Sequence, residues 1–363
     1  MNKTLFEKIE NNSELNRQDL IEMLSLEEPA DLQRLYAAAY QIKLKNIGKK
    51  VYLRGLIEYS NICTKNCYYC GIRRDNHKVK RYTLSEDEAL NAAGLASQAN
   101  FGSIVIQSGE RSDQQFTDNI ESMVRKIYEK YGENLGITLS TGEQNEEVYK
   151  RWFEAGARRF LLRIETSDPK LYQHLHPTDH SYEKRLACIR LLQSIGYQTG
   201  TGVMIGLPGQ TIENLADDLL FFRDMDIDMI GMGPYLVHPD TPLAQQMPGF
   251  EHKKEHQLEL GLKMIASARI LLKDVNIAST TALQALRGDG RELGLAAGAN
   301  VIMPNITENR YRESYQLYEG KPGQNQDAQN VLAELFAGID ALGESVAFGE
   351  QGDPKHFFRR KKC

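Results

Sequence analysis

Short apolar runs alternate with amphipathic segments over residues 51–304 of this chain. The runs lie at residues 52–59, 103–108, 137–141, 160–165, 199–205, 229–235, 276–281 and 301–304. Between them, apolar residues recur at helical spacing, as Leu186, Ile189 and Leu192 do. Strands that alternate with helices indicate βαβ units and a parallel sheet. Eight such units predict an α/β fold, a complete (β/α)8 barrel of the TIM type.

Capping signals mark where some of the helices begin and end. Ser85 followed by Glu88 predicts a capping box, and Gly102 is expected to close the helix that follows. A second helix is expected over residues 146–155, with Gly156 after its last turn. Both signals fall between predicted strands, where each βα unit is expected to have its helix.

Helical segments flank the predicted barrel on both sides. Residues 1–50 are expected to form an N-terminal helical cap, and residues 51–323 the barrel. Residues 324–363 are expected to hold a C-terminal helix and a tail. The tail ends in a basic run, Phe-Phe-Arg-Arg-Lys-Lys-Cys, which is typical of a solvated end.

Composition and charge argue against nucleic-acid and membrane partners. The 363 residues carry a net charge of −5 with a pI of about 6.0, so no basic field favours nucleic acid. No apolar run reaches the ~18–20 residues of a membrane span, and residues 1–18 lack the apolar core of a signal peptide. Five cysteines, three of them clustered, argue against a disulfide framework. We expect a cytoplasmic protein with no membrane or nucleic-acid partner.

Three clustered cysteines follow the first apolar run. Cys63, Cys67 and Cys70 are spaced C-x3-C-x2-C, with no second cysteine pair of the kind that completes a structural zinc site. Iron–sulfur cubanes normally take four thiolates, so three leave one iron open. An open metal position indicates a catalytic site. The active site of such a barrel lies at the C-terminal ends of its strands, where this loop is expected.

Polar residues at other strand ends are further candidates. The run Gln107-Ser108-Gly109-Glu110 ends the second strand, where glycine allows a close ligand approach and the glutamate can accept from an ammonium group. Taken alone, the run also fits an ordinary β–α turn.

Two charges end the fourth apolar run. Arg163 and Glu165 are expected to point to one side as alternate strand residues. They fit either a structural ion pair or ligand contacts. Arg185, on the next helix, is expected to join them.

The cysteine spacing, with Tyr69 before the last thiol, resembles the signature of the radical SAM superfamily. Longer stretches resemble the family of the FeFe-hydrogenase maturase HydE, at residues 57–63, 70–76, 107–110, 161–166, 206–211, 233–243 and 298–305. The likeness runs from about residue 5 to residue 323. It implies a (β/α)8 barrel, in agreement with the strand count, and a role in building the H-cluster of FeFe-hydrogenase.

The resemblance also implies the cofactors and the residues that hold them. One 4Fe-4S cluster would be bound by Cys63, Cys67 and Cys70, with S-adenosyl-L-methionine (SAM) on the open iron. The residues expected at SAM are Tyr69, Gln107, Ser108, Gly109, Glu110, Arg163, Glu165, Arg185, Met204 and Gly206. Those expected at the substrate are Arg54, Thr138, Arg159, Met232, Thr280, Thr281 and Met303. Some family members carry a further C-terminal cysteine trio; this chain has none, so no second cluster is expected.

The substrate that the family implies is a cysteine-bound iron carbonyl cyanide unit, processed toward the diiron azadithiolate site. Expected partners are a second radical SAM maturase, a GTPase scaffold protein, and an electron donor such as ferredoxin or flavodoxin. A methylornithine synthase-like amino-acid mutase and a non-enzymatic iron–sulfur module remain alternatives. A biotin synthase-like activity is less favoured, because the later strands lack cysteines for a second cluster.

Overall fold

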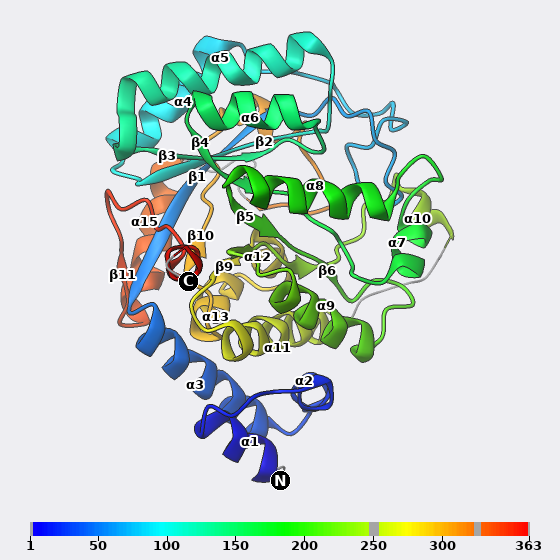
Figure 1. The fold of residues 1–363 in the computed structure, drawn as a ribbon, viewed down its shortest axis with the longest axis vertical. Helices are drawn as coiled ribbons and strands as arrows, with labels where there is room; N and C mark the ends of the chain where they lie inside the picture. The colour runs from blue at the N-terminus through cyan, green and yellow to red at the C-terminus, as the bar shows by residue number, and fades with distance from the viewer. Residues whose placement is uncertain (1–2, 247–253, 323–327, 362–363) are drawn as a thin grey trace.

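Eight parallel strands close into a barrel in the computed structural model, which describes residues 3–246, 254–322 and 328–361 (Figure 1). The barrel strands are β1 (Lys50–Ser60), β2 (Ser103–Ser108), β3 (Gly136–Ser140), β4 (Ala157–Leu161), β5 (Gln198–Thr201), β7 (Met229–Ile230), β9 (Asn276–Ser279) and β10 (Val301–Ile302). Neighbours in the sequence are neighbours in the barrel, and β10 pairs with β1 through Tyr52 and Val301. The predicted complete (β/α)8 barrel is confirmed.

Two of the predicted strands are interrupted. The runs 199–205 and 229–235 each continue beyond the barrel as a second short strand, β6 (Met204–Ile205) and β8 (Gly233–Pro234). These two strands pair only with each other in the described part of the chain. They extend the wall above the barrel rim.

Helices surround the barrel as expected (Figure 1). The longer ones are α4 (Glu86–Gln98), α5 (Gln114–Tyr131), α6 (Glu146–Ala155), α8 (Tyr182–Ile195), α9 (Ile212–Asp224), α11 (Lys254–Leu272) and α13 (Gly290–Ala296). Shorter pieces are η1 (Gly132–Asn134), α7 (Pro169–Leu175), α10 (Pro242–Gln246), α12 (Thr281–Leu286) and α14 (Asn309–Arg312). Their apolar faces pack on the strands; on α6, the buried Trp152 stacks at 6.4 Å on Phe160 of β4.

The caps confirm all but one of the sequence signals. Ser85 and Glu88 form a reciprocal capping box, and Gly156 follows α6 with φ +126°. The expectation for Gly102 is wrong, because α4 ends at Gln98 and Asn100 takes the left-handed conformation with φ +56°. Asparagine tolerates this conformation better than most residues.

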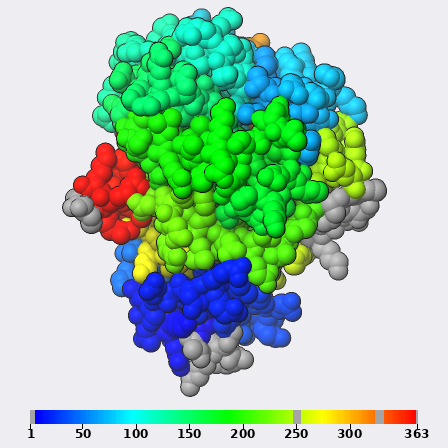
Figure 2. All heavy atoms as spheres, turned by 45° about the vertical axis from the view of Figure 1, so that its right-hand side comes forward, coloured from blue at the N-terminus to red at the C-terminus, as the bar shows by residue number. Residues whose placement is uncertain are grey.

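Three helices precede the barrel. They are α1 (Lys3–Glu10), α2 (Arg17–Leu24) and α3 (Pro29–Asn46). They pack along α9 and α11 on the outside of the barrel (Figures 1 and 2). The buried Lys263 of α11 donates to the carbonyl of Leu26, 3.0 Å away, which ties the two layers together.

The segment after the barrel returns to it. The basic run expected to be a solvated end is partly exposed, at Arg359 and Lys361, but it also contacts the barrel, and its residues 362–363 lie outside the described structure. After α15 (Ala328–Ala341), β11 (Ser345–Val346) pairs with the start of β1, and α16 (Lys355–Arg360) lies against the barrel. Arg360 Nη2 is 2.9 Å from the fully buried carboxylate of Asp228, and Arg359 pairs with Asp274. Acidic groups on the barrel therefore hold Arg359 and Arg360, although the Arg359 side chain stays largely exposed to solvent.

The same segment closes the barrel at the N-terminal ends of its strands. The carbonyl of Gly352 accepts from Arg54 Nη2 (3.2 Å) and from Asn276 Nδ2 (2.7 Å). Asp353 forms an ion pair with the fully buried Arg159. The floor of the barrel is therefore built from buried guanidinium groups and a returning backbone.

None of the helices in the described residues combines the length and the apolar character that a membrane span requires.

We expect Asp353→Ala to lower the free energy of unfolding by about 3 kcal/mol, because it leaves the buried Arg159 guanidinium without its carboxylate. Glu350→Gln is the matched control. It removes the exposed pair with Lys50 from the same segment and should leave the free energy of unfolding close to that of wild type, because solvent screens exposed ion pairs. Urea unfolding of both variants measures the difference, and equal losses would contradict a sealing role for Asp353.

Candidate active site

A cavity of about 330 Å³ opens at the C-terminal ends of the barrel strands. Most of the residues singled out from the sequence line it, although they come from different strands and loops. They are Cys63, Cys67, Tyr69, Cys70, Gln107, Ser108, Gly109, Glu110, Arg163, Glu165, Arg185, Met204, Thr280, Thr281 and Met303. The barrel thus brings the cysteine loop and the polar strand ends to one wall.

The cysteine loop follows β1 directly and is held by β2. Thr64 N–H donates to the carbonyl of Glu110 (2.8 Å), and Glu110 N–H points at Cys63 Sγ (3.3 Å). Lys65 N–H also points at Cys63 Sγ, 3.4 Å away. Two backbone donors on one sulfur favour a thiolate at that position.

Burial makes these thiols poor acids in the absence of a cation. It raises the pKa of Cys63, raises that of Cys67 well above its usual range, and raises that of Cys70 to about 12. A bound metal deprotonates a coordinating thiol outright. The donor set, three thiols with no disulfide on the wall of one cavity, therefore fits a metal group.

The number of thiols matches an iron–sulfur cluster with one open iron. Such clusters are held by cysteine thiolates, and a cubane normally takes four. Cys63, Cys67 and Cys70 supply three of them from the wall of one cavity, so the donor set fits the expected cluster.

Gly109 is required by the close approach of β2 to the cysteine loop. A Cβ at this position would lie 2.4 Å from the carbonyl oxygen of Ile62 and 2.8 Å from the Cβ of Cys63. Contacts below 3.0 Å force a shift. The glycine thus lets the loop pack against the end of β2.

Glu110 lies in a group of charges at the cavity mouth. Its carboxylate is 3.2 Å from Lys65 Nζ and 3.3 Å from Arg185 Nη2. Burial opposes ionisation of Arg185, but Glu110 and Glu143 raise its pKa well above the ordinary value. The wall therefore offers both a carboxylate and fixed cations to a zwitterionic ligand.

Arg163 and Glu165 form the expected pair, but not as strand neighbours. Strand β4 ends at Leu161, and Glu165 has φ +68°, an uncommon conformation for a non-glycine residue. The Glu165 backbone bridges to β5 and β6, donating to the Gly202 carbonyl and accepting from Met204. Arg163 Nη2 lies 2.9 Å from the Glu165 carboxylate. The strained turn presents both charges to the cavity.

Three buried polar atoms on the cavity wall have no hydrogen-bond partner among the described residues. They are Arg163 Nε, Thr280 Oγ1 and Glu165 Oε2, of which the last still has its ion-pair contact with Arg163. The first two lack any partner in the described part of the chain. A neighbouring hydroxyl is engaged, because Thr281 Oγ1 is 3.0 Å from the Tyr318 hydroxyl. Buried polar groups normally find a partner, so these two atoms indicate a ligand.

The structure does not bring Arg54, Thr138 and Arg159 to the cavity. Arg159 Nε donates to Thr138 Oγ1 (3.0 Å), and both arginines contact the segment that closes the floor. Arg54 and Thr138 border only a small void of about 20 Å³ beneath the cavity. Apolar side chains, such as Leu161 and Met303, line both spaces and lie between them.

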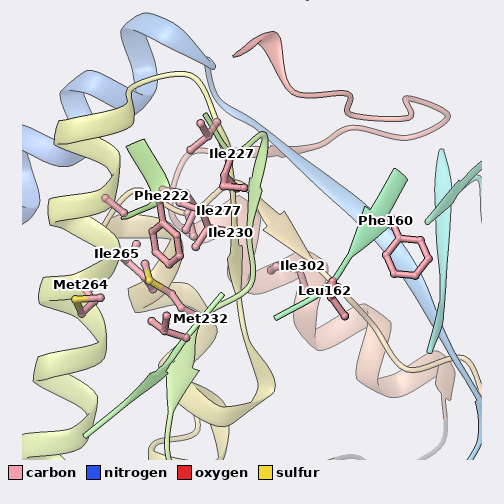
Figure 3. Close-up of a cluster of buried hydrophobic side chains, with 14 of the residues drawn as sticks. Phe160, Leu162, Phe222, Ile227, Ile230, Met232, Met264, Ile265, Ile277 and Ile302 are labelled. Atoms are coloured by element: carbon pink, nitrogen blue, oxygen red, sulfur yellow. The ribbon is translucent and has the colours of Figure 1, made fainter. Parts of the chain in front are cut away.

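Met232 and Gly206 also lie outside the cavity lining. In the chain beyond β7, Gly231 and Gly233 line the cavity, and the intervening Met232 turns away into the core. Figure 3 shows Met232 on the side of the wall that faces Met264 of α11.

Gly206 instead shapes a turn, with φ +74°. Its N–H donates to Gln210 Oε1, 2.7 Å away. The residue supports the wall near Met204 without reaching the cavity.

Several residues of the site were not predicted from the sequence. Glu58, at the end of β1, pairs with Lys321, and both are buried on the cavity wall. Tyr315, from the same segment as Lys321, lines the cavity and its carbonyl accepts from Lys321 Nζ (3.0 Å). The sequence could have indicated Glu58, because it is a charged residue at the end of an apolar strand. It could not have indicated Lys321 or Tyr315, because they reach the site through a loop.

The model of the radical SAM superfamily matches residues 57–222. The chain is 46% identical over 319 residues to the [FeFe] hydrogenase maturase subunit HydE of Thermotoga maritima, covering 88% of each protein. It is 28% identical over 333 residues to 3-methylornithine synthase of Methanosarcina acetivorans, covering 91% of each.

Among solved structures, the fold is similar to that of methylornithine synthase. The TM-score is 0.81 at 25% sequence identity, covering 95% of this chain and 98% of that one. The likeness extends over the barrel and its flanking helices.

Gly109→Ala is expected to displace the cysteine loop and to reduce the iron bound per chain after anaerobic reconstitution to less than about half of wild type, since its Cβ has no room. Gly288→Ala is the control, because nothing lies within 4 Å of the added Cβ. Iron and sulfide analysis of the two variants measures the effect. Full iron content in Gly109→Ala would contradict the close-packing argument.

Proposed function

Because this chain belongs to the HydE family of the radical SAM superfamily, we propose that it cleaves SAM reductively and acts in the assembly of the FeFe-hydrogenase H-cluster. One observation carries the proposal. The three cysteines, the Gln107–Glu110 run and the Arg163–Glu165 pair line a single cavity at the mouth of the barrel. The superfamily implies a 4Fe-4S cluster and SAM, and this wall has the donors for both.

The cluster, bound through Cys63, Cys67 and Cys70, would supply the electron that converts SAM to methionine and a 5′-deoxyadenosyl radical. The protein's own residues bind and orient the cofactor. Glu110 accepts from the methionine ammonium group, and Arg185 donates to the methionine carboxylate. Glu165 accepts from the ribose hydroxyls.

The cavity wall also protects the reacting groups from water. Its lining includes apolar side chains from several strands, namely Leu56, Val105, Leu161, Leu162, Met204 and Met303. Above them, the Glu58–Lys321 pair joins β1 to the segment that crosses the mouth. Exclusion of water suppresses side reactions of a reactive intermediate.

The substrate is proposed to lie deeper in the cavity, near Thr280, Thr281 and Met303. The unpartnered hydroxyl of Thr280 is suited to a polar ligand atom. A cysteine-bound iron carbonyl cyanide unit, the substrate that the family implies, offers such acceptors. Arg54, Thr138 and Arg159 are assigned to the barrel floor instead. The returning segment contacts both arginines, and the Thr138 hydroxyl accepts from Arg159 Nε.

One cluster is proposed for the whole chain. The two further cysteines are Cys188, buried on α8, and Cys363, at the other end of the sequence from the trio. The proposed partners are a second radical SAM maturase, a GTPase scaffold protein and a ferredoxin or flavodoxin as electron donor.

A methylornithine synthase-like activity is the second candidate, favoured by the close match of the two barrels. The higher identity to the maturase, 46% against 28%, favours the first.

Replacing any one of Cys63, Cys67 and Cys70 by alanine is expected to abolish 5′-deoxyadenosine formation, because the cluster then lacks a thiolate. Cys188→Ala, in a buried position on α8 outside the cavity, should retain it. Reconstituted protein is incubated anaerobically with dithionite and SAM, and the nucleoside is quantified. No 5′-deoxyadenosine from wild-type protein would overturn the radical SAM assignment.

Omission of this protein from an in vitro maturation mixture is expected to leave apo-hydrogenase inactive, and its addition should restore hydrogen evolution. The reconstituted protein given lysine together with SAM and dithionite should form no methylornithine. Activation without the protein would contradict the maturase role, whereas methylornithine formation would establish the second candidate.

A further inference from the structure

Glu143 lies directly behind the cavity wall, in the turn that follows β3. It is buried and does not line the cavity, although its neighbour Gly142 does. The hydroxyl of Tyr149 fixes this turn on both sides of Glu143. Gln144 N–H donates to the Tyr149 hydroxyl (3.0 Å), which donates to the carbonyl of Gly142 (3.2 Å). The Glu143 carboxylate is therefore presented from a rigid backbone.

Glu143 holds the guanidinium of Arg185 on the side away from the cavity. Arg185 Nε donates to Glu143 Oε1 at 2.7 Å, and Nη1 donates to the carbonyl of Arg163 at 2.8 Å. Nη2 has the longer contact, 3.3 Å, to Glu110. A guanidinium is planar, with its donors in a fixed fork. Fixing Nε and Nη1 thus determines where Nη2 points, and Nη2 is the group left to a ligand.

Lys65 depends on the same carboxylate. Its Nζ lies 3.4 Å from Glu143 Oε2 and 3.2 Å from Glu110 Oε1. The exposed Lys184 is farther from Glu143, at 3.7 Å. When Glu110 turns to the ammonium group of a ligand, Glu143 still balances the charges of Lys65 and Arg185. It is the counter-ion that remains while Glu110 exchanges partners.

Glu143 stays ionised in this position. Burial acts to raise its pKa, but Arg185 and Lys65 hold that pKa below the ordinary value for glutamate. An ionised, fixed carboxylate strengthens and aims the hydrogen bonds of both cations.

We propose that Glu143 is a positioning residue for the carboxylate of SAM, acting through Arg185 and Lys65. The inference rests on the proposed function to the extent that this wall binds SAM. A purely stabilising ion pair would affect all ligands alike. A positioning role instead predicts that loss of Glu143 weakens binding only of ligands that carry the carboxylate.

The test compares SAM with decarboxylated SAM, which keeps the ammonium and sulfonium groups. Equilibrium dialysis is done on the oxidised, cluster-loaded protein without reductant, so that no cleavage occurs. Glu143→Gln, which keeps the size of the side chain but loses its charge, should raise the Kd for SAM about ten-fold. The Kd for decarboxylated SAM should stay within about two-fold of wild type. Glu143→Ala should show the same selectivity with a larger loss.

Glu147→Gln is the matched control, an exposed glutamate on α6 that undergoes the same charge change. Iron content and thermal stability are measured on each variant to confirm the fold and the cluster. Equal weakening of both ligands would indicate a structural role and overturn the proposal, as would unchanged SAM binding in both Glu143 variants. Failure of the wild-type protein to bind SAM would overturn the proposed function with it.

Discussion

The pairing of β1 with both β2 and β10 is the constraint on which the rest of the structure depends. It closes the sheet, and closure makes all eight carboxyl ends of the strands face one space. The cysteine loop leaves β1 at that rim, and Glu110 leaves β2 beside it. A single strand thus fixes both the ring and the position of the thiols.

The two ends of the barrel manage buried charge in different ways. At the floor, Arg54 and Arg159 are held by a backbone carbonyl and a carboxylate from a returning segment, in contacts that use most of their donors. At the mouth, Lys65 and Arg185 share two carboxylates, of which Glu110 faces the cavity. The floor contacts come from the chain itself, although Arg54 Nε and Arg159 Nη2 keep no partner among the described residues, whereas the mouth has one partner that a ligand can replace.

The apolar pattern was sufficient to predict the fold, because barrel strands and their helices are encoded by local runs. It also predicted most of the cavity wall, since a parallel barrel gathers its strand ends at one rim. The pattern could not show that β4 stops at Leu161, because the apolar run continues to Ile164 and the break depends on the unusual backbone at Glu165. Met232 was expected at the substrate, but its neighbours Gly231 and Gly233 build the cavity wall at that place.

Residues that reach the site or the floor from distant loops had no signal in the sequence. Lys321 and Asp353 are separated from Glu58 and Arg159 by most of the chain, and no spacing rule connects them. Glu143 was missed for another reason. It does not face the cavity, and its role follows only from the orientation that it imposes on Arg185.

The returning segment has a consequence for the order in which the protein is made. Arg54 and Arg159 belong to strands that leave the ribosome early, yet Gly352 and Asp353 are synthesised only after every barrel strand. Until then, the growing chain has a barrel interior with two guanidinium groups that lack these partners. These floor contacts can therefore form only late in synthesis, after β10 has already been made.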